Sequence, residues 1–275
     1  MSFRETAPVL TAESLTLGYG GDPVVRDLDL TVAEGEFTVI VGPNGCGKST
    51  LLKALGRVNR PRSGKVLLHG RDVRSQRPKA VARQLALLPQ GPLAPEGITV
   101  RALAARGRFP HHTLLRQWIP EDETAIARAL ELTALTDLAD VQVGALSGGQ
   151  RQRAWVAMVL AQDSATLLLD EPTTYLDIAH QYDLLELFAD LHRRGRTVVA
   201  VLHDLAQAAR FATRLVMMEG GAVVADGTPE EVVTAERVAA VFGLACDVVP
   251  DPRTGTPLVI PHERAIREAT SGATT

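Results

Sequence analysis

Lysine is scarce in this chain of 275 residues, and its few positions are informative. Lysine and arginine together number 29, yet lysine occurs only at positions 48, 53, 65 and 79. This scarcity favours a specific role for Lys48, which lies inside a glycine-rich loop. Acidic residues number 32 and the formal net charge is −3, so the overall charge gives no sign of a nucleic-acid partner.

Cysteine and long apolar runs are also rare. Cys46 and Cys246 are too few and too far apart for a disulfide framework or a zinc cluster, which favours a reducing compartment. The chain opens without the charged and apolar regions of a secretion signal, and runs such as Val198 to Leu202 are far too short to cross a bilayer. We therefore expect a soluble protein that reaches a membrane only through a partner.

The apolar residues that are present form short runs that alternate with amphipathic stretches. This alternation is typical of an α/β fold in which helices flank a mainly parallel sheet. Strands are predicted at Phe37 to Val41, Leu85 to Leu88, Leu167 to Leu169, Thr197 to Leu202 and Leu215 to Met218, with two more around a turn within Val248 to Ile260.

Helical periodicity without strand runs marks residues 91–162, for example in Glu121 to Leu132 and Arg151 to Leu160. This segment predicts a helical subdomain inserted into a sheet domain. We expect one domain at residues 1–265, with its sheet core at about 8–90 and 163–261 and its helical subdomain at about 91–162. The small polar tail, residues 266–275, is expected to be disordered.

A glycine-rich loop lies between the predicted strand Thr38 to Val41 and the helical run Ser49 to Leu55. It satisfies the pattern G-x-x-x-x-G-K-[ST] and comprises Gly42, Pro43, Asn44, Gly45, Cys46, Gly47, Lys48, Ser49 and Thr50. Glycine lets successive N–H groups converge on phosphate oxygens, and the helix N-terminus adds donors. Lys48 is expected to reach the β- and γ-phosphates and Ser49 to bind Mg²⁺. The alternative, a merely tight strand-to-helix turn, does not account for the lysine.

Two adjacent carboxylates end the apolar strand Leu167 to Leu169. Neighbouring side chains on a strand face different directions, so Asp170 and Glu171 can have different roles. Asp170 is expected to hold Mg²⁺ and Glu171 to polarise the water that attacks the γ-phosphate. Alone, such a pair is more often a helix N-cap or a solvated turn than part of a functional site. The presence of the phosphate loop makes the functional interpretation the favoured one.

Two further residues have weaker signals. His203 follows the run Val198 to Leu202, at the edge where open α/β sheets bind ligands, and could hydrogen-bond a γ-phosphate. Tyr19 lies between two glycines and could stack on adenine. Both residue types occur in such positions for structural reasons as well, so their assignment depends on a family resemblance.

A second small-residue loop, Ser147, Gly148, Gly149 and Gln150, opens a predicted helix and offers another anion site. The run Leu146 to Gln150, followed by Arg-Gln-Arg, resembles the signature of ABC ATPases. The resemblance spans nearly the whole chain and implies a P-loop NTPase fold with a mainly parallel sheet, flanking helices, an antiparallel β region and a helical subdomain. In that family one subunit's signature closes over ATP on the other's phosphate loop, which implies a head-to-tail dimer of two copies.

The resemblance also implies roles for single residues at a catalytic site that includes Lys48. Tyr19 resembles the aromatic residue that stacks on adenine, and Gln90 resembles the glutamine that senses the γ-phosphate and Mg²⁺. Glu171 matches the catalytic glutamate and His203 the switch histidine.

Asp177 matches the family's aspartate that faces the second subunit and its nucleotide. Thr174, Tyr175 and Leu176 precede it here in place of the commoner Ser-Ala-Leu, which indicates a subgroup. Four stretches resemble the ATPase subunits of bacterial ferric-siderophore importers, most closely those of the ferric-enterobactin type: Gly107 to His111, Gln150 to Gln162, Asp170 to Gln181 and Gly255 to Pro261. Cobalamin and haem importers are the near alternatives.

The resemblance implies an ATPase at the cytoplasmic face of the membrane, bound to permease subunits and served indirectly by a substrate-binding protein. The face within Gly91 to Arg116 is expected to grip the permease, and we interpret Phe109 and Trp118 as core residues rather than partner anchors. A soluble ABC ATPase of translation or DNA repair is the rival, disfavoured by the single cassette and the lack of long coiled coils. Both Glu171 and His203 disfavour a non-hydrolytic regulator.

Cys46 lies near Lys48 and a helix N-terminus, surroundings that favour a thiolate. We hypothesise that alkylation of this thiol inhibits and that ATP protects it. An inert spacer residue is the equally open alternative.

Overall fold

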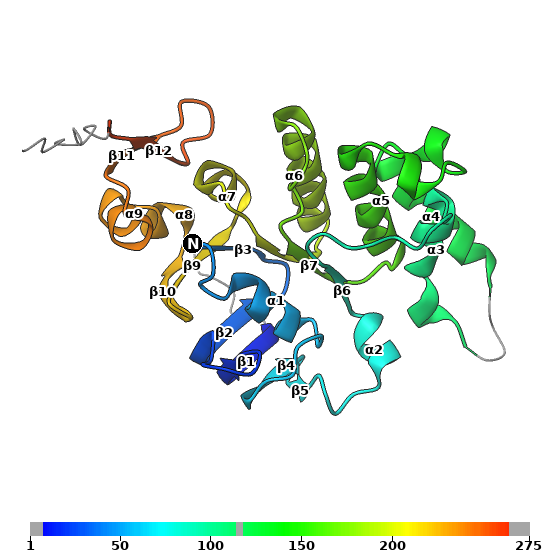
Figure 1. The fold of residues 1–275 in the computed structure, drawn as a ribbon, viewed down its shortest axis with the longest axis horizontal. Helices are drawn as coiled ribbons and strands as arrows, with labels where there is room; N and C mark the ends of the chain where they lie inside the picture. Colours follow the sequence, from blue (N-terminus) through cyan, green and yellow to red (C-terminus); the bar gives the residue numbers. More distant parts are fainter. Residues whose placement is uncertain (1–7, 114–117, 264–275) are drawn as a thin grey trace, which may run out of the picture.

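The computed structural model describes residues 8–113 and 118–263, so the tail at 266–275 lies outside the described residues. Three sheets make up the β structure (Figure 1). The strands are β1 Pro8–Leu17, β2 Val25–Ala33, β3 Phe37–Val41, β4 Ser63–Leu68, β5 Arg71–Asp72, β6 Leu85–Leu88, β7 Thr166–Asp170, β8 Thr197–Val201, β9 Arg214–Glu219, β10 Ala222–Gly227, β11 Cys246–Pro250 and β12 Pro257–Pro261. The helices are α1 Lys48–Leu55, α2 Pro78–Ala82, α3 Val100–Arg106, α4 Pro120–Leu132, α5 Gly148–Ala161, α6 Ile178–Arg193, α7 Leu205–Phe211, α8 Pro229–Val232 and α9 Ala235–Phe242, with short 3-10 turns η1 Phe109–His111, η2 Thr136–Leu138 and η3 Val143–Ala145.

The central sheet has six strands in the order β10-β9-β3-β8-β7-β6. All neighbours in it are parallel except β10, which pairs antiparallel with β9. Every residue of β3, β7 and β8 is buried, as expected for parallel strands covered on both faces. The mainly parallel sheet predicted from the sequence is therefore confirmed, and the carboxyl ends of β3, β6, β7 and β8 meet at one edge.

Each face of this sheet forms its own core. Phe37, Val39 and Val41 of β3 belong to one apolar cluster with Leu185 and Phe188 of α6. Ile40, on the opposite face of the same strand, belongs to a second cluster with α1 and β1. Figure 1 shows the result, with α6 and α7 on one side of the sheet and α1 with the smaller sheet on the other.

The second sheet is antiparallel, with strands in the order β2-β1-β4-β5. Sequence analysis anticipated an antiparallel region but identified none of its strands. In β2 the buried residues Val25, Leu28, Leu30 and Val32 alternate with exposed ones, except at Asp27, where the register shifts and φ is 44°. That irregularity interrupts the period of two on which strand prediction depends.

The helical elements α3 to α5 lie between β6 and β7, at the right of Figure 1. Thr99 caps α3 by accepting the N–H of Ala102, and Ser147 with Gln150 forms a capping box at the start of α5. Among the residues that the structure describes, no helix has the length and apolar character needed to span a bilayer.

The interpretation of Phe109 and Trp118 as core residues is wrong. Phe109 is 63% exposed and Trp118 is 49% exposed. Phe109 lies in η1, where Lys79 Nζ lies 4.4 Å from its ring centroid. Trp118 lies beside His112, with the two rings tilted and their centroids 5.9 Å apart. Both rings therefore belong to the surface of the helical region, and for Phe109 the reason is that the short η1 turn has no inward face wide enough to bury an aromatic ring.

Candidate active site

The glycine-rich loop joins β3 to α1 through backbone shapes that need glycine. Gly42 has φ 149°, and a Cβ atom there would lie 2.1 Å from the carbonyl oxygen of Met218. Gly47 has φ 104°, and its Cβ would lie 2.8 Å from Val25 Cγ2. The loop is thus pressed against β9 and β2 while its other side stays open. That open side carries the N–H groups of the first turn of α1, which have no partner within the helix.

Lys48 lies at the start of α1, and only 5% of it is exposed. Its Nζ donates hydrogen bonds to the carbonyl oxygens of Gly42 and Pro43, each at 2.8 Å. The ammonium group is therefore held over the loop rather than extended into solvent. A phosphate placed on the loop would meet both this cation and the helix dipole.

A cavity of about 370 Å³ lies above the loop, and its walls come from five segments that are distant in the sequence. The lining residues are Val24, Asn44, Gly45, Gly47, Lys48, Ser49, Thr50, Gln90, Glu171 and His203. The volume is within the range of small-molecule sites. Six of the nine predicted phosphate-loop residues therefore share one cavity with three predicted catalytic side chains.

Glu171 also lines this cavity, and its side chain is 11% exposed. Its Oε1 lies 2.6 Å from His203 Nε2, and its Oε2 accepts a hydrogen bond from Gln90 Nε2 at 2.7 Å. The backbone of Glu171 has φ 51°, a conformation uncommon for residues other than glycine, so the carboxylate is aimed by a strained turn at the end of β7. The end of β6 supplies Gln90 and the end of β8 supplies His203.

Asp170 is the last residue of β7 and is completely buried. Among the described residues neither of its carboxylate oxygens has a hydrogen-bond partner, and its Oδ2 forms an ion pair with Lys53 Nζ at 3.5 Å. A buried carboxylate normally has its lone pairs satisfied, so these two oxygens are available to a cation or to water bound to one. The donor set of Asp170 carboxylate, Ser49 hydroxyl and Gln90 amide is the oxygen-rich kind that Mg²⁺ accepts.

Tyr19 lies at one end of a smaller cavity of about 170 Å³, which is also lined by Asn59 and Arg60. The ring is 69% exposed, and its hydroxyl accepts a hydrogen bond from Asn59 Nδ2 at 2.7 Å. Thr50 lines both this cavity and the one above the phosphate loop. A ligand with phosphates at Lys48 can therefore continue past Thr50 to an aromatic face.

The second small-residue loop is not part of either cavity. Ser147 Oγ accepts the N–H of Gln150 at 3.2 Å, and Gln150 Oε1 accepts the N–H of Ser147 at 3.0 Å. Gly148 and Gly149 face the chain segment of Tyr175 and Leu176. These four predicted binding residues are thus separate from the phosphate loop of their own chain.

Asp177 also lies outside both cavities, as the exposed N-cap of α6. The N–H of His180 and then the His180 ring, 2.7 Å away, hold the pKa of Asp177 below its ordinary value of 3.8. The carboxylate is consequently ionised at neutral pH and occupied with capping its own helix.

Three residues at the site were not found by sequence analysis. Val24 lines the main cavity, Lys53 lies beside Asp170, and Thr174 Oγ1 is 3.3 Å from Glu171 Oε2. Of the three, Lys53 had a sequence feature that could have identified it, because it is one of only four lysines and lies five residues after Lys48. Val24 and Thr174 have no such signal, since their positions depend on the antiparallel sheet and on the turn after Glu171.

Cys46 is 4% exposed, and its Sγ lies 3.9 Å from Lys48 Nζ. The thiol faces the core cluster beneath the loop and does not line the cavity. A reagent therefore reaches it only when the loop opens, which favours the interpretation of Cys46 as a spacer.

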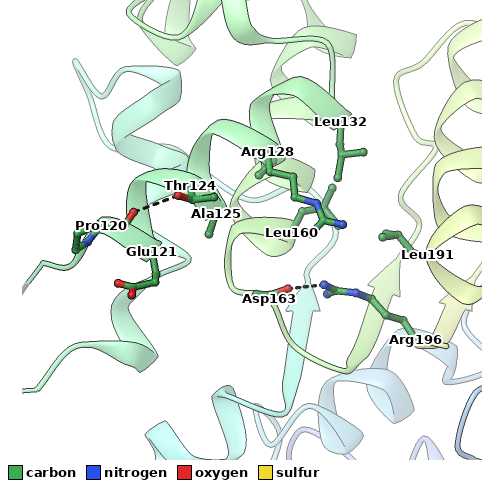
Figure 2. Close-up of a pocket in the computed structure, with 11 residues that line it drawn as sticks. Pro120, Glu121, Thr124, Ala125, Arg128, Leu132, Leu160, Asp163, Leu191 and Arg196 are labelled. Atoms are coloured by element: carbon green, nitrogen blue, oxygen red, sulfur yellow. Dashed lines mark hydrogen bonds and ion pairs between the residues drawn. The ribbon is translucent and has the colours of Figure 1, made fainter. Parts of the chain in front are cut away.

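Figure 2 shows another cavity, of about 420 Å³. It is bounded by α4, the end of α5, Leu191 of α6 and Arg196 before β8. Arg196 pairs with Asp163, where the chain leaves α5 with φ 56°. None of the predicted phosphate-binding or catalytic residues lines it, so its size alone does not make it the active site.

Comparison with known proteins adds a family to this geometry. The family model for ABC transporters matches residues 25–174. A probable siderophore transport system ATP-binding protein of Bacillus subtilis (strain 168) is 52% identical over 256 residues, which cover 93% of each chain. The ferric enterobactin transport ATP-binding protein of Escherichia coli (strain K12) is 52% identical over 261 residues, 94% of this chain and 96% of that one. A chain from the structure of an inward-facing ABC transporter, described as of the metal-chelate type, aligns with a TM-score of 0.79 and 27% identity, covering 94% of this chain and 98% of that chain.

Proposed function

Because the chain belongs to the ABC transporter family, we propose that it is the ATP-hydrolysing subunit of a bacterial importer whose cargo is a ferric siderophore. The observation that carries the ATPase assignment is the shared cavity of Lys48, Ser49, Gln90, Glu171 and His203. The cargo assignment depends on the names of the two relatives at 52% identity. No residue of this cavity has a reason to contact the cargo.

In the proposed reaction the phosphate loop and Lys48 bind the triphosphate, and Tyr19 stacks on the adenine. Glu171 accepts a hydrogen bond from the attacking water and orients it toward the γ-phosphate, while His203 and Gln90 hold the carboxylate in place. Ser49, Asp170 and Gln90 would hold Mg²⁺, which would supply positive charge to stabilise the triphosphate. The carboxylate oxygens of Asp170, which have no hydrogen-bond partner among the described residues, support this site for the cation.

The predicted binding residues Ser147, Gly148, Gly149 and Gln150 lie outside the cavity above the phosphate loop of their own chain. We infer that a second copy supplies them, with the helix N-terminus of α5 directed at the γ-phosphate. Asp177 is expected to face the same nucleotide from the second copy. ATP then acts as the contact between the two copies, and its hydrolysis lets them separate.

The permease is expected to dock on the helical region. A cavity of about 510 Å³ there is lined by Ala102, Ala105, Arg106, Phe109 and His112. The small side chains of α3 leave room for a short helix, and the exposed Phe109 ring offers it an apolar contact. We expect this attachment to hold the chain at the cytoplasmic face of the membrane, with the substrate-binding protein on the opposite face.

Replacing Lys48 with Ala should weaken ATP binding about thirtyfold, because a charge-assisted hydrogen bond to phosphate contributes about 2 kcal/mol. Calorimetry with Mg²⁺ and ATP measures the change in Kd. Lys65→Ala is the matched control, since Lys65 lies on β4 and pairs at the surface with Glu13. Equal affinities of Lys48→Ala and the unmodified chain would remove Lys48 from the site.

The cargo is tested with the complex reconstituted in vesicles with its permease and its substrate-binding protein. Ferric enterobactin bound to that protein should raise ATP turnover above the level without cargo. Haem or cobalamin raising it instead would overturn the siderophore assignment and leave the ATPase assignment in place. Co-purification of ribosomes or DNA ends in place of a permease would overturn the transport assignment itself.

A further inference from the structure

The loop of residues 172–176, which follows Glu171, joins the strand end to the N-cap of α6. Glu171 has φ 51° and Tyr175 has φ 68°, so strained backbone lies just before the loop and within it. Such conformations persist only where the surroundings determine them. Contacts that hold this loop therefore also fix the direction of the Glu171 carboxylate.

One of these contacts comes from α5, the helix that Ser147 caps. Gln152, on α5 and only 8% exposed, donates through Nε2 to the carbonyl oxygen of Pro172 at 2.9 Å. Pro172 is itself buried and directly follows Glu171. The same helix touches the loop again at Gly149, where an added Cβ would lie 3.1 Å from Leu176 Cδ2.

The other end of the loop is held from the sheet domain. Gln181 on α6 donates through Nε2 to the carbonyl oxygen of Leu176 at 3.0 Å. Its Oε1 accepts a hydrogen bond at 2.7 Å from Nε2 of Gln207, a residue on α7 that is 4% exposed. The N–H of Gln207 in turn donates to the Asp204 side chain at 2.9 Å.

Asp204 is the residue after His203, whose Nε2 lies 2.6 Å from Glu171 Oε1. The contacts therefore close a ring that runs from Glu171 through His203, Asp204, Gln207 and Gln181 back to the 172–176 loop. Gln152 joins this ring to α5. Because Gln152 is hydrogen-bonded to Pro172, a displacement of α5 would also displace the peptide next to the Glu171 carboxylate.

We propose that Gln152 and Gln181 are positioning residues that couple the position of α5 to the orientation of the Glu171 carboxylate. The inference rests on the proposed ATPase function. It adds a means by which contact of residues 147–150 with the nucleotide of the second copy changes the orientation, and so the reactivity, of Glu171 in their own chain. Neither side chain lines the cavity above the phosphate loop. Each holds one backbone carbonyl of the 172–176 loop.

The test replaces Gln152 with Met, which has similar length and cannot donate to Pro172. Turnover of ATP by the full chain should fall about tenfold or more. This is the size of effect expected when a catalytic group is displaced by less than about 1 Å from its productive position. KM for ATP should stay within about twofold, since the phosphate loop is untouched. Gln76→Met is the matched control, because Gln76 Nε2 also donates to a backbone carbonyl, that of Arg71 at 3.2 Å, but outside the site.

Gln181→Met keeps the inference testable if Gln152→Met does not fold, because Gln181 is partly exposed. The double variant should be no slower than the slower single variant, since releasing either end of the loop already frees Glu171. Unchanged kcat in both single variants, or a raised KM with unchanged kcat, would overturn the inference. Absence of ATP turnover in the unmodified chain and in Gln76→Met would instead contradict the proposed function.

Discussion

Replacing Glu171 with Gln should reduce ATP turnover at least a hundredfold while leaving ATP binding intact. A carboxylate that accepts the proton of an attacking water contributes about 10²–10⁴ in rate, and the amide cannot accept that proton. The phosphate loop, Lys48 and Tyr19 are unaffected, so calorimetry should give an unchanged Kd. Because hydrolysis no longer separates the two copies, size-exclusion chromatography with ATP and Mg²⁺ should show a dimer.

The matched control is Glu186→Gln, which changes an exposed glutamate on α6. It should keep the turnover of the unmodified chain, and both should elute as monomers once the ATP is hydrolysed. Turnover in Glu171→Gln equal to that of the control would show that another group activates the water. His203, which contacts Glu171 at 2.6 Å, would then be the next candidate.

The second large effect concerns stability and lies in the helical region. Arg108 and Asp122 form a buried ion pair, with Nε 2.7 Å from Oδ1, and the exposed fraction of Asp122 is 0%. Arg108→Met should lower the free energy of unfolding by about 3 kcal/mol or more, because it leaves a buried carboxylate without its main partner. Urea unfolding measures this change, and Arg106→Met, an exposed neighbour, should change the free energy by less than about 0.5 kcal/mol.

The same pair gives the sign of a pH dependence. Burial alone would raise the pKa of Asp122, but hydrogen bonds from Arg108, from the N–H of Ile119 and from His112, together with the charge of Arg108, hold it below its ordinary value of 3.8. A carboxylate whose pKa is lower in the folded state stabilises the fold above pH 3.8 and loses that contribution as the pH falls through the folded value. The stability difference between the unmodified chain and Asp122→Asn should therefore be constant at neutral pH and shrink below pH 3.8. A difference that grows on acidification would contradict this assignment.

The parallel half of the fold was predictable because its strands are continuous apolar runs. Local sequence alone predicts buried strands at Phe37 to Val41 and Thr197 to Leu202, whichever strands they pair with. The antiparallel sheet was not located, since β2 is broken by the register shift at Asp27 and β5 has only two residues. Exposed rings such as Phe109 were misjudged because hydrophobicity alone does not show which side chains a short turn can bury.

For the candidate site, sequence motifs indicated which residues matter, and the fold shows how they meet. The order of strands places Gln90, Glu171 and His203 at the ends of β6, β7 and β8, three neighbours in the sheet. Their mutual contacts at 2.6 and 2.7 Å could not be predicted, because they depend on the strained turn at Glu171. The buried amide of Gln152 was equally hidden, since its partner is a backbone carbonyl and leaves no trace in the side-chain pattern.

The central claim is that the phosphates of ATP are bound by the backbone N–H groups of the phosphate loop and the first turn of α1, together with the ammonium of Lys48. Equilibrium titration of the purified full-length chain with ATP and Mg²⁺ tests it most directly, with AMP as the ligand that has the same base but lacks the β- and γ-phosphates. Saturable binding of one ATP per chain, with AMP bound far more weakly, is the predicted result. Equal affinity for ATP and AMP, or no binding of either, would contradict the account.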